Sequence, residues 1–327
     1  MLKLFKGSQP ALIIIILLLT GLMWIRSFFQ SAEFQLTYDL FEMPLWHFLN
    51  SFLGNSEIIR KIIAMILLII NALWLSRMNT KFILVKTRTY LPTLFYGFIC
   101  SSFLPMLDLN PALIAVTLFV QAVDLLFESY KEEKLSYKYF ESSLLVSCGS
   151  LFYGPAALSM VIIWISLSIL KTPGWRDWMF TIIGFILPYL FLLSLLYVFD
   201  ENVPEYFRNI LINFKITRGF DYLDNIKIIY FSFIFILILL ASVKMIRVYQ
   251  GLKIYARIYY RVFFWIFVFT VGIFFSLYNR SFELIYFTTL PVSYILTFYF
   301  YSIRSRFLGE LLFSIFIGLV LFVEVMR

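Results

Sequence analysis

Charged residues are scarce in this chain of 327 residues. Asp, Glu, Lys and Arg together make up 14% of it, whereas about 25% is usual for a soluble domain. So few charges cannot cover the surface of a chain in which 62% of the residues are hydrophobic. The composition therefore excludes a soluble globular domain and an intrinsically disordered chain. It predicts an all-α integral membrane protein with many spans.

Cysteine and histidine are almost absent, and this excludes several kinds of chemistry. Cys100 and Cys148 lie in apolar runs, so we expect two small core residues rather than a disulfide or a metal pair. A single histidine, His47, excludes an HExxH zinc site and a haem held by two histidines. The sequence has no CxxC, no Gly-rich phosphate loop and no GxGxxG motif. It predicts no metal site and no cofactor.

What the chain does contain is a series of long apolar runs. A helix needs about 20 apolar residues to cross a hydrocarbon core of about 30 Å, and the sequence predicts about eleven such transmembrane helices. Their predicted ranges are 11–28, 58–76, 88–105, 110–128, 139–153, 156–170, 177–199, 226–246, 258–278, 283–301 and 307–325. Little is left for a soluble domain, so we expect one polytopic membrane domain over 1–327. No small-residue cleavage site follows the first run, which we interpret as a retained helix.

The distribution of Lys and Arg predicts the orientation. With the N-terminus in the cytoplasm, most of the 27 basic residues fall in cytoplasmic segments, as the positive-inside rule requires. We therefore assign the net charge of +8 to topology and not to nucleic acid. The run 139–170 is interrupted by Gly154-Pro155, which predicts two short helices joined by a tight outer turn.

Two outer segments are long, 29–57 and 200–225, and each holds an amphipathic stretch. One helical face of the first carries Leu45, Phe48, Leu49, Phe52 and Leu53, behind Pro44. The corresponding face of the second carries Tyr206, Phe207, Ile210, Leu211 and Phe214, behind Asn202 and Pro204. We expect both to be interfacial helices in the headgroup plane, either as a platform beside an outer-face site or as plain connectors.

Acidic residues and arginines gather on the predicted outer side, and we expect no equivalent gathering on the inner side. A site that binds a phosphate and removes a proton needs a cation for the anion and a carboxylate as base. The candidate bases are Glu33, Asp39 and Glu42. The candidate substrate- and phosphate-binding residues are Arg26, Arg60, Asp108, Asn110, Arg218 and Arg280. Asn110-Pro111 is also typical of a helix start, with Asn as the N-cap.

Three stretches carry a resemblance to a family. They are ESSLLVSCGSLFYGPAAL at 141–158, KTPGWRDW at 171–178 and GFILPY at 184–189. Together they resemble an uncharacterised family of bacterial polytopic inner-membrane proteins of about this length, which has no assigned activity.

The first half, 1–200, is similar in architecture to the membrane core of C-type glycosyltransferases. Both have an N-terminal span, then a long acidic outer loop with surface helices, then short paired spans with a break like Ser150-Leu-Phe-Tyr-Gly-Pro. The resemblance implies a polyprenyl-phosphate sugar as donor, an outer-loop carboxylate as base and basic residues on the lipid phosphate. The chain departs from that family because it lacks the usual paired acidic motif and a periplasmic domain after the last span. Residues 201–327 would form additional C-terminal helices.

Three functions follow as alternatives. The first is a glycosyltransferase of envelope glycan assembly that acts on a polyprenyl-phosphate-linked donor at the outer face of the membrane. The second is a non-catalytic subunit or scaffold that binds partner membrane subunits, favoured by the lack of a strong motif and by the aromatic content of 20%. The third is a transporter of lipid or lipid-linked saccharide, whose opening would be lined by Gln121 and Asp124, or by Ser142, Ser143 and Ser147. For these residues we prefer close helix contacts as the interpretation.

Overall fold

The computed structural model describes residues 2–7, 9–29, 41–54, 56–85, 87–102, 106–130, 136–199, 203–212, 225–276, 283–303 and 305–325. Within these residues the secondary structure is helical and contains no strand. Eight of the described helices are long and apolar enough to cross a membrane. The all-α prediction is therefore confirmed for the described residues, and the protein has the helices of a multi-pass membrane protein.

A helix lies in each of the eleven predicted segments. The eight long helices are α2 (Pro10–Phe29), α4 (Glu57–Phe82), α6 (Pro111–Glu128), α9 (Trp175–Val198), α11 (Asn225–Val248), α12 (Ile254–Ser276), α13 (Leu284–Ser302) and α14 (Arg306–Val325). The three short ones are α5 (Leu91–Ser101), α7 (Tyr137–Ser150) and α8 (Ser159–Leu170). At 1.5 Å per residue the short helices extend only roughly 17 to 21 Å, less than a hydrocarbon core. The count of eleven crossings and their orientation stay predictions.

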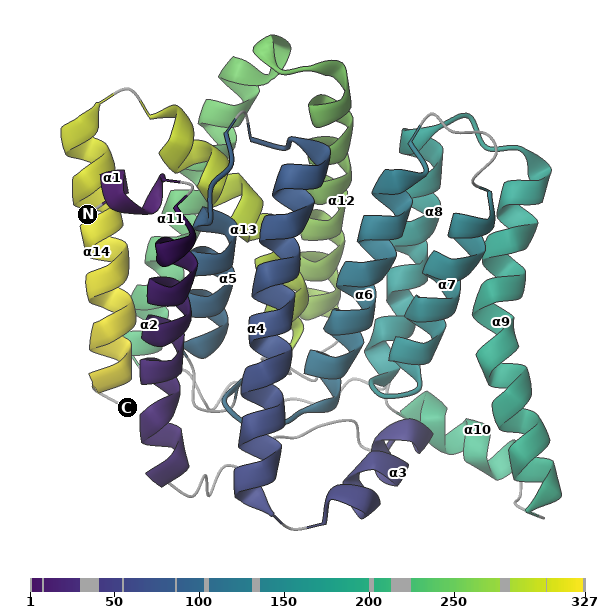
Figure 1. Ribbon diagram of the computed structural model, residues 1–327. Helices are drawn as coiled ribbons and strands as arrows, with labels where there is room; N and C mark the ends of the chain where they lie inside the picture. The colour runs from purple at the N-terminus through teal and green to yellow at the C-terminus, as the bar shows by residue number, and fades with distance from the viewer. Residues whose placement is uncertain are drawn as a thin grey trace.

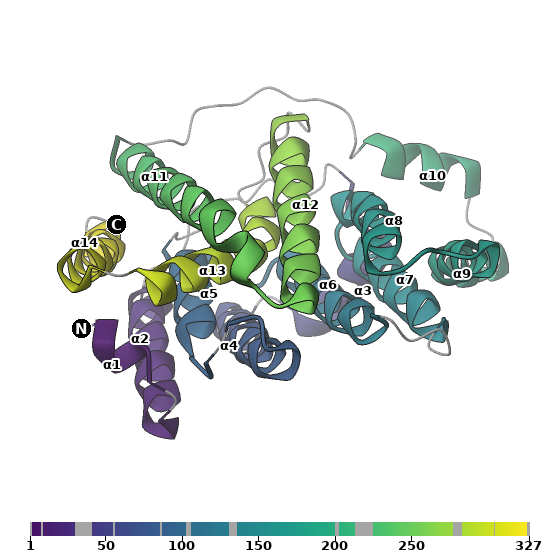
Figure 2. The same cartoon turned by 90° about the horizontal axis from the view of Figure 1, so that it is seen from above.

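The helices stand side by side, and α13 lies among them (Figures 1 and 2). It packs against α5, α6, α11 and α12 and is buried over most of its length. Buried tyrosines tie it to its neighbours: Tyr294 donates a hydrogen bond to the carbonyl of Leu75 at 2.7 Å, and Tyr286 donates to that of Met106 at 2.6 Å. Such bonds hold helices together where the surrounding lipid gives no hydrophobic driving force.

The first predicted span packs into this bundle. In α2 the Trp24 side chain is fully buried, and its Nε1 donates to Ser101 Oγ at the end of α5 at 3.0 Å. The first residues of the chain form α1 (Leu2–Phe5), which lies beside the first half of α14; the Leu2 amide donates to Glu310 Oε2 at 3.0 Å. The last described residues end α14, so the two termini lie toward opposite ends of that helix (Figure 1).

Helix α7 packs between α6 and α9 through small residues. A Cβ on Gly184 of α9 would come within 2.2 Å of Ser143 Oγ, so only glycine fits at this contact. Ser147 donates to the carbonyl of Phe185 at 2.6 Å, and Ser142 donates to that of Ala122 at 3.2 Å. These serines lie at close helix contacts, as the preferred interpretation of the sequence predicted.

The turn at Gly154-Pro155 is present as predicted. It forms η3 (Gly154–Leu158), a short 3-10 helix that leads directly into α8.

The predicted span 88–105 is wrong in extent, because the helix there is α5 and covers only Leu91–Ser101. Every residue of α5 is buried, so this short helix is enclosed by protein rather than by lipid. Both cysteines are free, as expected: Cys100 is buried in α5 and Cys148 is half-buried in α7.

Candidate functional site

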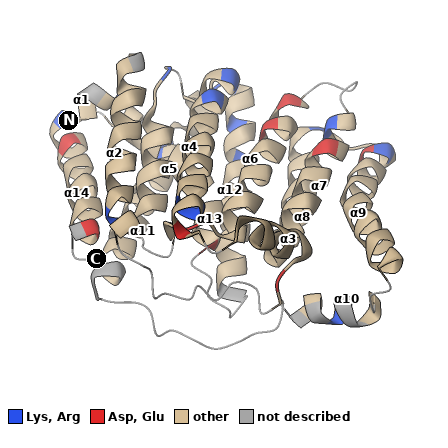
Figure 3. Ribbon diagram, turned by 60° about the horizontal axis from the view of Figure 1, so that its bottom comes forward, with Lys and Arg blue, Asp and Glu red and all other residues tan. Residues whose placement is uncertain are grey.

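Charged residues concentrate toward the two ends of the helices (Figure 3). At one end lie α3 (Pro44–Leu53) and α10 (Val203–Ile212), together with the first residues of α4 and α6 (Figure 1). We call this the α3 end. We call the opposite one, where α4 and α6 finish and α7 and α9 begin, the Lys81 end. The two predicted amphipathic helices are confirmed as helices and share one end; their place in an outer headgroup plane stays a prediction.

Helix α3 docks on the turn between α7 and α8. The amide of Leu45 donates to the carbonyl of Leu151 at 3.1 Å, and Trp46 is buried. The apolar face predicted for this helix is divided in the structure, because Phe48 and Phe52 are 70% and 81% exposed. Trp46 was not among the candidate site residues singled out from the sequence.

Arg60, in the first turn of α4, connects the elements of the α3 end. Its Nη1 donates to Asn50 Oδ1 at 2.7 Å, and its guanidinium lies 5.8 Å from the centre of the Trp46 ring. The Asp108 carboxylate is 3.9 Å from Nε, which is beyond hydrogen-bond distance, and no described residue accepts a hydrogen bond from Nε. The Arg60 side chain is only 18% exposed. It is a partly buried cation held by a neutral amide and an aromatic ring.

Asp108 lies near Arg60, and Asn110 follows it two residues later in the chain. The side chains of both form hydrogen bonds within the protein. Asp108 Oδ1 accepts from the amide of Leu109 at 2.7 Å. Asn110 is fully buried and caps α6, because its Oδ1 accepts from the amide of Leu113 at 2.8 Å. Its Nδ2 donates to Tyr286 Oη at 3.2 Å. The predicted helix start at Asn110-Pro111 is confirmed.

Two other predicted site residues, Glu42 and Arg26, lie in the described part of the chain, and each bonds to residues other than Arg60. Glu42 lies just before α3 and pairs with His47 Nδ1 at 2.9 Å, where both side chains are well exposed. Arg26 donates to the carbonyl of Glu324 at 2.9 Å and so joins the ends of α2 and α14. Four further candidates lie outside the described residues: Glu33, Asp39, Arg218 and Arg280.

A buried lysine at the same end was not among the predicted residues. Lys61 Nζ donates to the carbonyl of Ser27 at 2.7 Å and lies 3.6 Å from Glu57 Oε2. Its position in α4, one residue after Arg60 and on the face toward α2, joins α4 to α2. The only signal in the sequence was a basic pair at the start of an apolar run, which is also typical of an exposed helix end.

The Lys81 end carries a network of acidic and basic residues, so the expectation that only one side gathers acids is wrong. Lys81 contacts both oxygens of Asp124, at 3.0 and 3.1 Å, and Trp74 Nε1 donates to the same carboxylate at 3.3 Å. Lys81 and Lys138 each form an ion pair with Glu128. The network joins α4, α6 and α7. Its cations are lysines.

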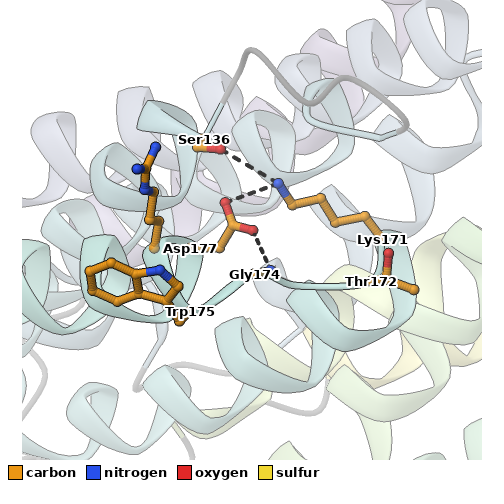
Figure 4. A pocket seen from close by; sticks show the side chains of 7 residues that line it. Ser136, Lys171, Thr172, Gly174, Trp175 and Asp177 are labelled. Atoms are coloured by element: carbon orange, nitrogen blue, oxygen red, sulfur yellow. Dashed lines mark hydrogen bonds and ion pairs between the residues drawn. The ribbon is translucent and has the colours of Figure 1, made fainter.

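Beside this network lies a pocket of about 720 Å³ at the start of α9 (Figure 4). Its lining consists of Ser136, Lys171, Thr172, Gly174, Trp175, Arg176 and Asp177. Lys171 and Asp177 point toward one another, with Nζ and Oδ1 2.9 Å apart (Figure 4). The pocket is therefore polar and partly charged.

An apolar groove of about 370 Å³ lies between α8 and α12. Its lining consists of Leu158, Ile165, Trp265, Val268, Phe269, Gly272 and Ile273. Leu158 ends η3, which follows the turn on which α3 docks, so the groove begins near the α3 end. In the described part of the chain, no group of three or more His, Cys, Asp or Glu side chains could hold a metal ion.

The helices and their apolar surfaces define the class of protein, a multi-pass helical membrane protein. Comparison with known families is more specific, because residues 40–327 match a family of unknown function, DUF6427. The chain belongs to this family, which covers both ends described above. No curated protein and no solved structure shows significant similarity to it.

Proposed function

We propose that the protein transfers a sugar from a polyprenyl-phosphate carrier during assembly of an envelope glycan, at the face of a bacterial cytoplasmic membrane where the α3 end lies. The observation that carries this proposal is Arg60, a partly buried guanidinium between the Trp46 ring and Asn50. No described carboxylate is within hydrogen-bond distance of it. The Asp108 carboxylate offsets part of its charge, and the guanidinium N–H groups that bond to no described residue remain for an anion that arrives from the membrane.

A phosphate monoester suits this position better than a carboxylate or a neutral head group. Guanidinium N–H groups match the spacing of phosphate oxygens, and such charge-assisted bonds are about twice as strong as neutral ones. Partial burial strengthens the attraction further, because water screens it less. The phosphate of a lipid carrier lies at the membrane interface, and Arg60 lies in the first turn of a spanning helix.

The proposed base is a carboxylate of the segment between α2 and α3, with Glu33, Asp39 and Glu42 as candidates. Phe29 ends α2 and Phe41 precedes α3, so this segment joins two elements that meet at the α3 end. The carboxylate removes the proton of an acceptor hydroxyl, whose oxygen bonds to the anomeric carbon. The bond from that carbon to the phosphate oxygen breaks, and the polyprenyl phosphate leaves with the electron pair. Arg60 stabilises the charge on this leaving group.

The groove between α8 and α12 supports the lipid part of the proposal. It lies on helices that are apolar enough to span a membrane or are packed among them, and its lining is almost entirely hydrocarbon and aromatic. A branched apolar chain fits such a groove without leaving a buried polar group unpaired. Since the groove begins near the α3 end, one lipid could place its chain there and its phosphate near Arg60.

The decisive experiment measures binding of undecaprenyl phosphate to the purified full chain in detergent by native mass spectrometry. We expect Arg60→Gln to weaken binding at least about tenfold, the loss of one charge-assisted hydrogen bond. The matched control is Arg77→Gln on the same helix. Arg77 also stacks on a tryptophan, 5.3 Å from the Trp74 ring, but at the Lys81 end and exposed to solvent.

Undecaprenol, which has the same chain and no phosphate, separates the two parts of the lipid. We expect it to bind the parent chain and Arg60→Gln equally. Equal binding of undecaprenyl phosphate by both chains would contradict the proposal and favour a non-catalytic subunit. Transfer is then tested by replacing Glu33, Asp39 and Glu42 one at a time with the amide, since the base must be one of them.

Filling the groove tests the chain-binding part. A Cβ on Gly272 meets no atom within 4 Å, so Gly272→Phe places a ring in the groove without a backbone clash. Gly318 in α14 has the same open surroundings outside the groove, which makes Gly318→Phe the matched control. We expect only Gly272→Phe to weaken undecaprenol binding, several-fold. An equal effect of both variants would exclude the groove as the chain site.

A further inference from the structure

The pocket at the start of α9 lies at the opposite end of the molecule from Arg60 and has no part in the proposed transfer. It is bounded by the loop between α8 and α9 on one side and by Ser136, just before α7, on the other (Figure 4). Its volume of about 720 Å³ is in the range of pockets that hold small ligands or head groups.

The carboxylate of Asp177, the acidic residue of the pocket, forms hydrogen bonds within the protein through both of its oxygens. Asp177 Oδ2 accepts from the amide of Gly174 at 2.8 Å, which caps α9. Its Oδ1 accepts from Lys171 Nζ at 2.9 Å, and the same ammonium lies 5.0 Å from the centre of the Tyr139 ring. The charges of Lys171 and Asp177 therefore offset each other, and this pair forms the wall of the pocket.

Arg176 remains as the cation of the pocket that no described residue balances. It is exposed, and no described carboxylate forms an ion pair with it. Trp175 beside it is 72% exposed, and Thr172 adds a hydroxyl group. A guanidinium, an indole ring and a hydroxyl at the start of a spanning helix are the groups that interact with lipid head groups at the edge of a membrane.

From these groups we infer that the pocket binds a phosphate ester, with the phosphate on Arg176 and the ester part against Trp175. The same chemistry is offered by an anionic phospholipid and by a soluble phosphate ester. The pair of Lys171 and Asp177 positions the loop. The positive charge of Lys171 also offsets the negative charge of Asp177, which would otherwise repel the anion. If the Lys81 end faces the cytoplasm, the phospholipid is one of the inner leaflet.

The experiment uses the full chain in detergent and native mass spectrometry with phosphatidylglycerol, and diacylglycerol of the same chains as the phosphate-free control. We expect phosphatidylglycerol to bind the parent chain, and Arg176→Gln to weaken this binding at least about tenfold while leaving the thermal midpoint unchanged. Arg176→Lys should restore part of the affinity, because it keeps the charge but not the planar fork.

Arg306→Gln is the matched control, since Arg306 is also an exposed arginine at the start of a spanning helix at the Lys81 end. Unchanged binding by Arg176→Gln, or an equal loss with Arg306→Gln, would overturn the inference. Competition with glycerol 3-phosphate identifies the source: displacement at equal concentration assigns a soluble ester, and lack of displacement assigns the lipid. Because undecaprenyl phosphate binding is measured at Arg60, failure here leaves the proposed function standing.

Discussion

The two ends of the molecule use charge differently. At the Lys81 end, Asp124, Glu128 and Asp177 each have a lysine partner, so the charges are balanced within the protein and hold helices together. At the α3 end, Arg60 is held by Trp46 and Asn50, and its nearest described carboxylate is 3.9 Å away. The contrast teaches that a gathering of acids and bases is not by itself a site. What distinguishes Arg60 is a guanidinium whose Nε has no hydrogen-bond partner among the described residues and whose nearest carboxylate forms only a loose ion pair.

The largest stability effect is expected at the Lys81 end, from Asp124→Ala. The substitution leaves Lys81 with Glu128 alone and removes the acceptor of Trp74 Nε1. We expect the free energy of unfolding to fall by about 2 kcal/mol, less than the 3–5 kcal/mol typical when a fully buried pair is broken, because Lys81 is partly exposed. Reversible unfolding in detergent measures this. If the free energy of unfolding fell no more than in Glu42→Gln, the ion pairs of the Lys81 end would not stabilise the protein more than the exposed pair at the α3 end.

A smaller effect is expected from Asn110→Ala at the α3 end, where a neutral cap and not an ion pair stabilises the helix. The loss of the Leu113 hydrogen bond should lower the free energy of unfolding by about 1–2 kcal/mol. Asn110→Ser keeps a capping oxygen without adding a charge at this fully buried position, and it serves as the control in the same unfolding measurement. Equal destabilisation by both substitutions would show that the contact with Tyr286, and not the cap, is what matters.

A loss of about 1 kcal/mol is expected from Lys171→Gln. The ammonium is partly buried and bonds to Asp177, so its removal leaves that carboxylate without its cationic partner. Arg176→Gln, five residues along, should cost nothing measurable, because no described residue pairs with Arg176. Thermal midpoints of the two variants compare them directly. Equal losses would mean that Arg176 also serves the fold.

The smallest effect is expected from Glu42→Gln. Its ion pair with His47 is well exposed, and exposed pairs contribute little to stability. The thermal midpoint should stay within error, and His47→Gln should behave in the same way. A shift as large as that of Asn110→Ala would show that this pair fixes α3 on the bundle.

The sequence predicted well what depends on neighbouring residues. Apolar runs located a helix in all eleven segments, the spacing around Pro44 and Pro204 located α3 and α10, and Asn110-Pro111 located the start of α6. It failed where partners lie far apart in the chain. Lys81 and Asp124 are on different helices, and their pairing depends on how the two helices are rotated, which hydropathy does not specify. Trp46 and Asn50 were missed as partners of Arg60 for the same reason.

The length of α5 could not be predicted either. Its run is as apolar as that of a full span, yet the helix covers only Leu91–Ser101 and every residue in it is buried. Hydropathy reports that a segment avoids water. It does not report whether protein or lipid surrounds the segment. For α5 the answer depends on α13, which packs against it and against helices near the other end of the chain.

The enclosed α5 has a consequence for biosynthesis. Its most extensive neighbour is α13, and Leu284 follows Ser101 only after 183 further residues. At typical rates of translation the ribosome needs roughly 10 to 40 s for that stretch. During this time only α2 and α4, which precede α5 in the chain, can cover it, because α13 has not yet been made. The burial of α5 is therefore complete only after α13, near the end of the chain, has been made and has packed against it.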